Sequence, residues 1–148
     1  MTSEDIWLIV SLVVLILLSA FFSASETAYS SLNSIRIKNM AQDGNKKAAR
    51  VLRLTEKYDY LLTTILIGNN IVNLASASIA TILFVNLCDG DQNQGALIST
   101  IVMTVLVLIF GEISPKSIAR EMPEDFAMKV TPVLKILIII FYPLCLFF

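Results

Sequence analysis

The chain has 148 residues and a formal net charge of −1, and 56% of its residues are hydrophobic. Its mean hydropathy is +0.76 and its apolar residues form long uncharged blocks, a pattern that argues against a soluble globular domain. We expect an all-α integral membrane protein, because a helix satisfies its own backbone hydrogen bonds inside a bilayer.

Three blocks are long enough to be membrane-spanning helices. They cover residues 6–22, 60–87 and 95–110. With polar residues included at their ends and a rise of about 1.5 Å per residue, each block can cross a hydrocarbon core of about 30 Å. The first block has no basic segment before it and no small-residue cleavage site after it. We therefore expect a retained span rather than a removable signal peptide.

The basic residues predict the orientation of these spans. Seven of the eleven Lys and Arg residues lie in 36–57 and the other four in 116–135, whereas the N-terminal segment and the 88–95 loop are acidic. Short loops rich in Lys and Arg stay in the cytoplasm, so we expect a plasma-membrane protein with its N-terminus outside and its C-terminus cytoplasmic. The 36–57 segment is expected to be a juxtamembrane amphipathic helix beside anionic lipid, not a nucleic-acid surface.

The last apolar segment, 130–148, is interrupted by Pro132, Lys135 and Pro143. A proline inside a helix removes a backbone hydrogen bond and kinks or ends the helix. We therefore expect a re-entrant or interfacial helix pair here rather than a fourth span. The chain also stops within apolar sequence, so we expect that a cytosolic domain on its C-terminal side is absent.

Three carboxamides interrupt the middle span. Asn69, Asn70 and Asn73 follow Gly68 in an otherwise apolar run. Their i,i+3 and i,i+4 spacings gather the side chains toward one side of a helix, and Gly68 leaves room for another backbone to approach. One such Asn would be explained as a contact that holds two helices together, but three together also fit a ligand site. Both interpretations stay open.

The other two spans carry polar groups near their cytoplasmic ends. Pro115 has no N–H, so it is predicted to free the carbonyl of Gly111. Each group alone has a simpler explanation, such as a serine that bonds its own helix or a proline that ends one. The site hypothesis depends on their joint occurrence, and the candidates are Ser23, Ser25 and Glu26 in the first span and Gly111, Glu112 and Ser114 in the third.

The available donor atoms are hydroxyl, amide, carboxylate and backbone oxygens, and the chain contains no histidine. Zinc, copper and iron are therefore disfavoured. Oxygen donors suit the hard cations Mg²⁺, Ca²⁺, Na⁺ and K⁺, among which the residues alone do not choose. Interrupted spans of this kind resemble the discontinuous helices at which secondary transporters bind their ions.

Three motifs resemble the transmembrane domain of the CNNM/CorC family: "FFSASETAYSSLNSIRIKNM", "LLTTILIGNNIVNLASASIA" and "GEISPKSIARE". The resemblance covers nearly all of residues 1–148. It implies a homodimer of three-span subunits, each with a juxtamembrane helix and a belt of short cytosol-facing helices. It also implies that full-length members continue into an ATP-binding CBS pair and a small C-terminal domain, both absent from this chain.

The resemblance further implies a function. Members are implicated in Mg²⁺ efflux, so this chain is expected to export Mg²⁺ in exchange for Na⁺ by alternating access at an oxygen-lined site. The ion ligands implied by the motifs, together with chemically equivalent neighbours, are Ser25, Ser23, Asn70, Asn73, Asn69, Gly111 and Glu112.

Two other classes of function stay open at this point. The chain could be a regulator that senses Mg²⁺ without transporting it, or a passive scaffold in which Asn and Ser only hold a dimer together. A steady flux that depends on the site residues would separate a transporter from both. An enzyme is not expected, because the sequence has no His and no Cys beside a base.

Overall fold

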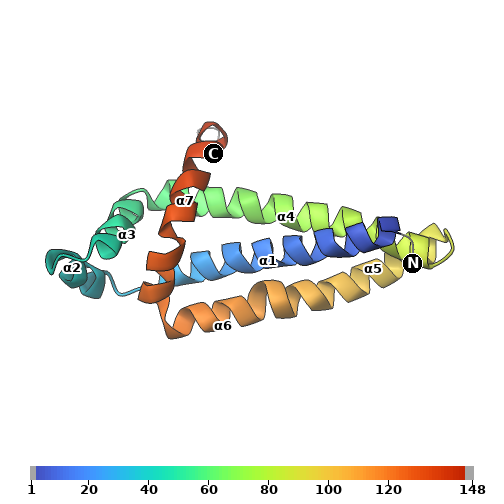
Figure 1. Cartoon of the computed structure of the whole chain (residues 1–148), viewed down its shortest axis with the longest axis horizontal. Helices are drawn as coiled ribbons and strands as arrows, with labels where there is room; N and C mark the ends of the chain where they lie inside the picture. The colour runs from blue at the N-terminus through green and yellow to red at the C-terminus, as the bar shows by residue number, and fades with distance from the viewer. Residues whose placement is uncertain (1–2, 146–148) are drawn as a thin grey trace. The chain divides into compact units, whose positions relative to one another are not determined.

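The computed structural model describes residues 3–145, and all regular secondary structure in that range is helical (Figure 1). This confirms the all-α class. The elements are α1 (Ser3–Ser31), α2 (Ser34–Gln42), α3 (Lys46–Glu56), α4 (Tyr58–Leu87), α5 (Gln92–Leu106), a π-helical segment η1 (Val107–Ile113), α6 (Ser114–Glu121) and α7 (Pro123–Cys145).

Four helical stretches are long and apolar enough to cross a membrane: Ser3–Ser31, Tyr58–Leu87, Gln92–Glu121 and Pro123–Pro143. The first three contain the predicted spans and extend each by polar residues at its ends. Large apolar side chains on these helices are exposed, for example Leu17 at 64% and Ile101 at 58%. Such an apolar exterior is suited to lipid rather than to water.

The C-terminal segment differs from the expectation, because α7 is one helix and not a helix pair. It passes through Pro132 and Pro143 without ending. Around Pro132, the side chains of Ala127, Thr131 and Leu134 are at most 1% exposed. Packing on both sides of the proline therefore offsets the backbone hydrogen bond that it removes. By length and composition, α7 is a fourth candidate span.

The basic 36–57 segment also differs from the expectation, since it forms two helices, α2 and α3, instead of one. Each begins at an asparagine cap: the Asn33 side chain accepts from the backbone N–H groups of Ile35 and Arg36, and Asn45 caps α3 in the same way. Gly44 separates the two helices with φ +95, a left-handed conformation that glycine adopts readily. The amphipathic character is confirmed in α3, whose buried residues are Ala48, Val51 and Leu54.

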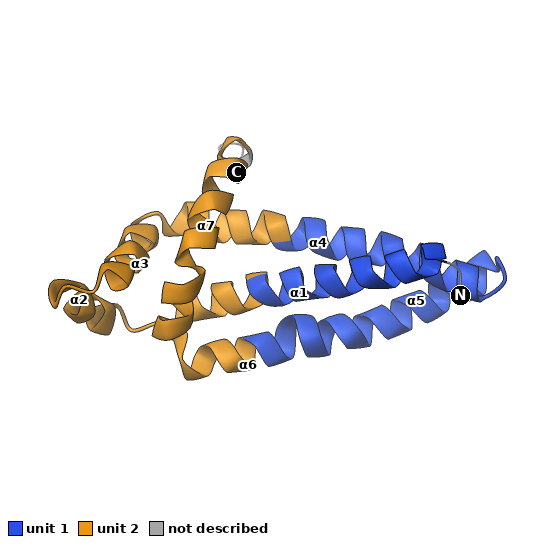
Figure 2. Cartoon of the chain, viewed as in Figure 1, with its two compact units in different colours: residues 1–21, 69–115 blue, residues 22–68, 116–148 orange. Residues whose placement is uncertain are grey.

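The chain divides into two compact units, each with buried residues of its own (Figure 2). Unit 1 consists of residues 1–21 and 69–115, and unit 2 of residues 22–68 and 116–148. Both α1 and α4 contribute residues to each unit. The core of unit 1 is formed by Leu12, Ala80, Leu83 and Met103.

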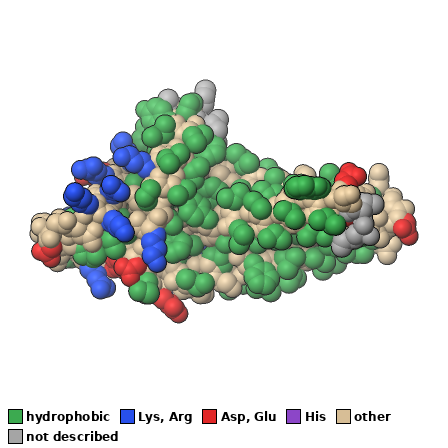
Figure 3. Space-filling model, in the orientation of Figure 1, with side chains coloured by type: hydrophobic (Ala, Val, Ile, Leu, Met, Phe, Trp, Pro, Cys, Tyr) green, Lys and Arg blue, Asp and Glu red, His purple; other side chains and the backbone are tan. Residues whose placement is uncertain are grey.

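Unit 2 contains the short helices α2 and α3 together with α6, α7 and parts of α1 and α4. Its fully buried residues include Ile37, Val51, Leu61 and Leu134. A buried hydrogen bond joins the Tyr29 hydroxyl to Thr131 Oγ1 at 2.5 Å, and Thr131 in turn donates to the Ala127 carbonyl. Figure 3 shows Lys and Arg side chains gathered over α2 and α3.

A tight turn joins α4 to α5 at residues 88–91, which confirms a turn here but shortens the predicted 88–95 loop, because α5 already begins at Gln92. Asp89 and Gly90 both have positive φ, and the Asp91 side chain accepts from the Gln94 N–H at the start of α5. A Cβ added at Gly95 would lie 2.6 Å from the Cα of Val85. The two helices therefore approach each other backbone to backbone, which only glycine permits at this position.

We predict that Gly95→Ala destabilises the α4–α5 hairpin, because the added methyl group meets backbone atoms that have no rotamer by which to move away. The expected loss is about 1–3 kcal/mol in the free energy of unfolding, as for other overpacked sites. Chemical unfolding in detergent measures it. Ala96→Ser is the control, since it adds one heavy atom at an exposed neighbour. Equal stability of the two variants would contradict the close approach.

Candidate ion site

Unit 1 contains a polar cluster around Ser19, a residue that the sequence analysis did not single out. Ser19 is 1% exposed. Its Oγ lies 3.2 Å from Asn69 Oδ1 and 3.3 Å from Asn73 Oδ1. Two carboxamides of the "GNNIVN" motif on α4 thus converge on one hydroxyl of α1, as their i,i+4 spacing predicts.

The hydroxyl cannot satisfy both amide oxygens at once. A serine carries one O–H donor, so it donates to Asn69 or to Asn73 while its own lone pairs face the other oxygen. The contact therefore brings oxygen atoms of α1 and α4 together at the buried Ser19 hydroxyl. Hydroxyl and amide oxygens are the ligand types that hard cations accept.

Gly111 brings the third polypeptide segment to the same cluster. It is buried, and a Cβ added to it would lie 3.1 Å from Ser19 Oγ. A side chain at this position would press against the hydroxyl. Glu112, the next residue in the chain, is half-buried, and among the described residues the structure shows no contact between its carboxylate and the cluster.

The backbone at Gly111 is irregular, although not in the way predicted. The sequence predicts an interruption at Pro115, and this is wrong, because the helix continues from η1 into α6 through Pro115. The freed carbonyl of Gly111 stays a prediction. The irregularity is the π-helical segment before the proline, where the Ser114 N–H donates to the Ile109 carbonyl, five residues earlier. Such segments are rare and are frequent at functional sites.

Asn70 does not share the Ser19 contact. Its side chain is exposed, and the chain turns by about 100° between Asn69 and Asn70, so the two carboxamides leave the helix in different directions. The structure therefore brings together Ser19, Asn69, Asn73 and Gly111 from unit 1. A role for Asn70 as a ligand stays a prediction.

Ser23 and Ser25 belong to unit 2, where they are 1% and 0% exposed. Gly68 lies in the same unit, and a Cβ added to it would lie 2.6 Å from Cζ of the Phe22 ring. The sequence analysis expected Gly68 to admit another backbone. Instead, the Phe22 ring occupies the space that a side chain at this position would need.

The cluster is made of neutral oxygens rather than of a carboxylate cage. Across the described residues, no group of three or more His, Cys, Asp or Glu side chains is placed to hold a metal ion. A site of hydroxyl and amide oxygens binds a hard cation without the several negative charges of a high-affinity site.

Ser19 escaped the sequence analysis because it is a single hydroxyl inside the first apolar block. One signal was present. Ser19 stands four residues before Ser23, the first residue of the "SAS" motif, so the two serines lie on the same face of a helix. Extending that face one turn toward the N-terminus would have included it.

These features define a class: an all-helical, multi-pass membrane protein whose apolar helices enclose a cluster of hydroxyl and carboxamide groups. Polar side chains in such a position either hold helices together or line an ion or substrate pathway. The comparison with known proteins then identifies the family. Residues 10–148 match the profile described as "Cyclin M transmembrane N-terminal domain", so the chain belongs to the CNNM family.

Several curated proteins are similar to the chain. A UPF0053 protein of Haemophilus influenzae is 41% identical over 137 residues, which cover 93% of this chain and 32% of that protein. The UPF0053 inner membrane protein YfjD of Escherichia coli is 42% identical over 127 residues, 86% of this chain and 29% of that protein. A chloroplastic DUF21 domain-containing protein of Arabidopsis thaliana is 36% identical over 137 residues, 89% of this chain and 20% of that protein. The chain spans about a third of the length of the two bacterial relatives.

We predict that Ser19→Ala lowers the free energy of unfolding, because it leaves the oxygens of Asn69 and Asn73 without the hydroxyl donor. The expected loss is about 0.5–1.5 kcal/mol, the range for one hydrogen bond in a protein interior. Ser11→Ala is the matched control on the same helix, since Ser11 donates only to the Trp7 carbonyl of its own helix. An equal effect of both substitutions in chemical unfolding would contradict a special role for Ser19.

Proposed function

We propose that this chain is the membrane domain of a Mg²⁺ exporter that exchanges cytoplasmic Mg²⁺ for external Na⁺ by alternating access. The observation that carries the proposal is the convergence of Asn69 and Asn73 on the buried Ser19 hydroxyl, against the backbone of Gly111. Membership of the CNNM family supports a membrane transporter or regulator. The finer assignment of ion and mechanism is ours.

The cluster supplies the ligand type that Mg²⁺ prefers. Mg²⁺ takes six oxygens in an octahedron at about 2.0–2.1 Å and gives up its water reluctantly. Ser19, Asn69 and Asn73 offer three neutral oxygens, so the ion would keep part of its hydration shell. The hydroxyl and amide dipoles would replace the rest during passage.

Glu112 is proposed to supply the compensating charge. A divalent ion in a membrane interior needs a nearby anion, and Glu112 is the half-buried carboxylate directly after Gly111. One carboxylate neutralises half the charge of Mg²⁺ and all the charge of Na⁺. A site with this charge can hold either ion in turn, which is what exchange requires.

The π-helical segment is proposed as the element that changes during transport. A wider turn with i→i−5 hydrogen bonds can return to α-helical pairing by a shift of one residue, which would move Gly111 and Glu112 relative to Ser19. The surrounding helices need not unfold for this change. Ser23, Ser25 and Asn70 remain proposed ligands of the same ion along its path.

The proposed orientation has the basic helices α2 and α3 in the cytoplasm of a plasma-membrane protein and the N-terminus outside. A homodimer and C-terminal cytosolic domains are also proposed, on the family resemblance. The greater length of the relatives is consistent with further domains in the full protein.

We predict that Asn73→Ala reduces Na⁺-driven Mg²⁺ flux by about 10- to 100-fold, the usual effect of losing one oriented group at a metal site. Flux is measured in proteoliposomes that contain a Mg²⁺-sensitive dye, with and without an opposed Na⁺ gradient. Asn93→Ala is the control, because Asn93 is an exposed carboxamide at the start of α5. Asn70→Ala, measured in parallel, tests whether the exposed carboxamide is also a ligand.

Two outcomes would contradict the proposal. Flux that is equal in Asn73→Ala and Asn93→Ala would remove the cluster from the ion path. Absence of flux in every variant, with Mg²⁺ binding by calorimetry that Asn73→Ala abolishes, would identify a Mg²⁺-sensing regulator instead of a transporter.

A further inference from the structure

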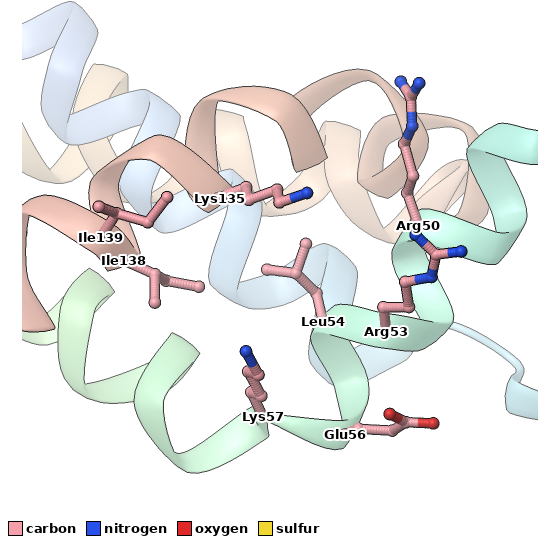
Figure 4. Close-up of a pocket in the computed structure, with 8 residues that line it drawn as sticks. All are labelled: Arg50, Arg53, Leu54, Glu56, Lys57, Lys135, Ile138 and Ile139. Carbon is pink, nitrogen blue, oxygen red and sulfur yellow. The ribbon is translucent and has the colours of Figure 1, made fainter.

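A basic hollow lies within unit 2, and none of its lining residues belongs to the proposed ion site. It has a volume of about 430 Å³ and is formed by α3, the residue that follows it and α7 (Figure 4). Four cationic side chains and one carboxylate line it, together with three apolar side chains. The lining residues are Arg50, Arg53, Leu54, Glu56, Lys57, Lys135, Ile138 and Ile139.

The lining residues from α3 follow one stripe of the helix. Arg50, Arg53, Leu54 and Lys57 stand at positions i, i+3, i+4 and i+7, so their side chains lie one above the other. Leu54 is 6% exposed and supplies an apolar floor between the cationic groups. The stripe presents three positive charges to the space in front of it.

The opposite wall comes from α7 and combines charge with apolar surface. Lys135 extends toward α3, while Lys57 extends from the end of α3 toward Ile138 (Figure 4). Ile138 and Ile139 follow Lys135 by three and four residues, so all three share one face of α7. Ile139 is 67% exposed, and its neighbour Ile140 is 62% exposed.

The charge in the hollow is not balanced by the protein. Glu56 is the single carboxylate among the lining residues, and Figure 4 shows it extending away from Lys57 and Lys135. Like charges held together raise the free energy of the fold unless an anion is bound. The hollow is therefore built to receive a negatively charged group.

We propose that this hollow binds the phosphate headgroup of an anionic phospholipid, with an acyl chain lying along Ile138 and Ile139. The apolar wall decides between a lipid and a free anion: it leads from the cationic groups onto the exposed isoleucines of a helix long enough to cross a membrane. A soluble phosphate would gain nothing from that wall. A basic pocket beside an apolar helix matches both parts of a phospholipid.

The test measures binding of fluorescent phosphatidylglycerol to the whole chain in a mild detergent. Each cationic side chain near a phospholipid surface changes binding by about fivefold, so Arg53→Gln with Lys135→Gln should weaken it by about 25-fold. Arg36→Gln with Lys38→Gln is the matched control, because it removes one Arg and one Lys from α2, outside the hollow. The control should bind within about twofold of the native chain.

Competition separates a lipid from a free anion. Unlabelled phosphatidylglycerol should displace the probe, whereas phosphatidylcholine and inorganic phosphate at equal concentration should not. Displacement by inorganic phosphate would show an anion site without lipid specificity and would overturn the proposal. Equal weakening in both double variants would also overturn it, since it would show attraction to total charge alone.

Folding of the variants is checked by circular dichroism. Lys135 is exposed, so the single Lys135→Gln variant keeps the fold and should weaken the probe by about fivefold. Unchanged binding in this variant would show that α7 does not contribute to the site and would overturn the proposal.

Discussion

The polar interior of unit 1 depends on the contact of one serine hydroxyl with two carboxamide oxygens. In an apolar bilayer an unsatisfied polar group is expensive, so Asn69 and Asn73 must find a partner on another helix. Ser19 is that partner, at 3.2 and 3.3 Å. Because it has one proton for two acceptors, the contact holds α1 against α4 and still leaves oxygen lone pairs available. The same contact is therefore compatible with helix packing and with the proposed ligand binding, so the two interpretations of the carboxamides do not exclude each other.

Gly111 of η1 is the residue of a third helical segment that approaches the same serine. Its lack of a side chain lets the η1 backbone reach the Ser19 hydroxyl, and the π-helical turns displace the local backbone from regular α-helical positions. A regular α-helix would place every carbonyl in an i→i−4 bond. An irregular backbone is tolerated at membrane depth where protein covers it, and in η1 the covered position is Gly111, the buried residue of this segment.

Much of the fold followed from composition, because long uncharged blocks have few solutions in a membrane. The three spans, the 88–91 turn and the i,i+4 pair of Asn69 and Asn73 were predictable on that basis. The predicted break at Pro132 was wrong. The burial of Ala127, Thr131 and Leu134 around this proline outweighs its local preference to end a helix. Ser19 was missed for the related reason that one hydroxyl in an apolar block carries no pattern of its own; its meaning comes from the helix packed against it.

The basic helices illustrate the same limit in unit 2. Sequence alone placed positive charge beside a membrane, and a dispersed charge would attract anionic lipid without selecting a site. The i, i+3, i+4, i+7 stripe of α3 faces Lys135 and the isoleucines of α7, two segments almost eighty residues apart in the chain. That pairing converts a general attraction into a hollow in which cationic groups of both helices lie beside the isoleucines of α7. A phospholipid bound in this hollow would contact α3 and α7 at once and so help to hold the two helices together within unit 2.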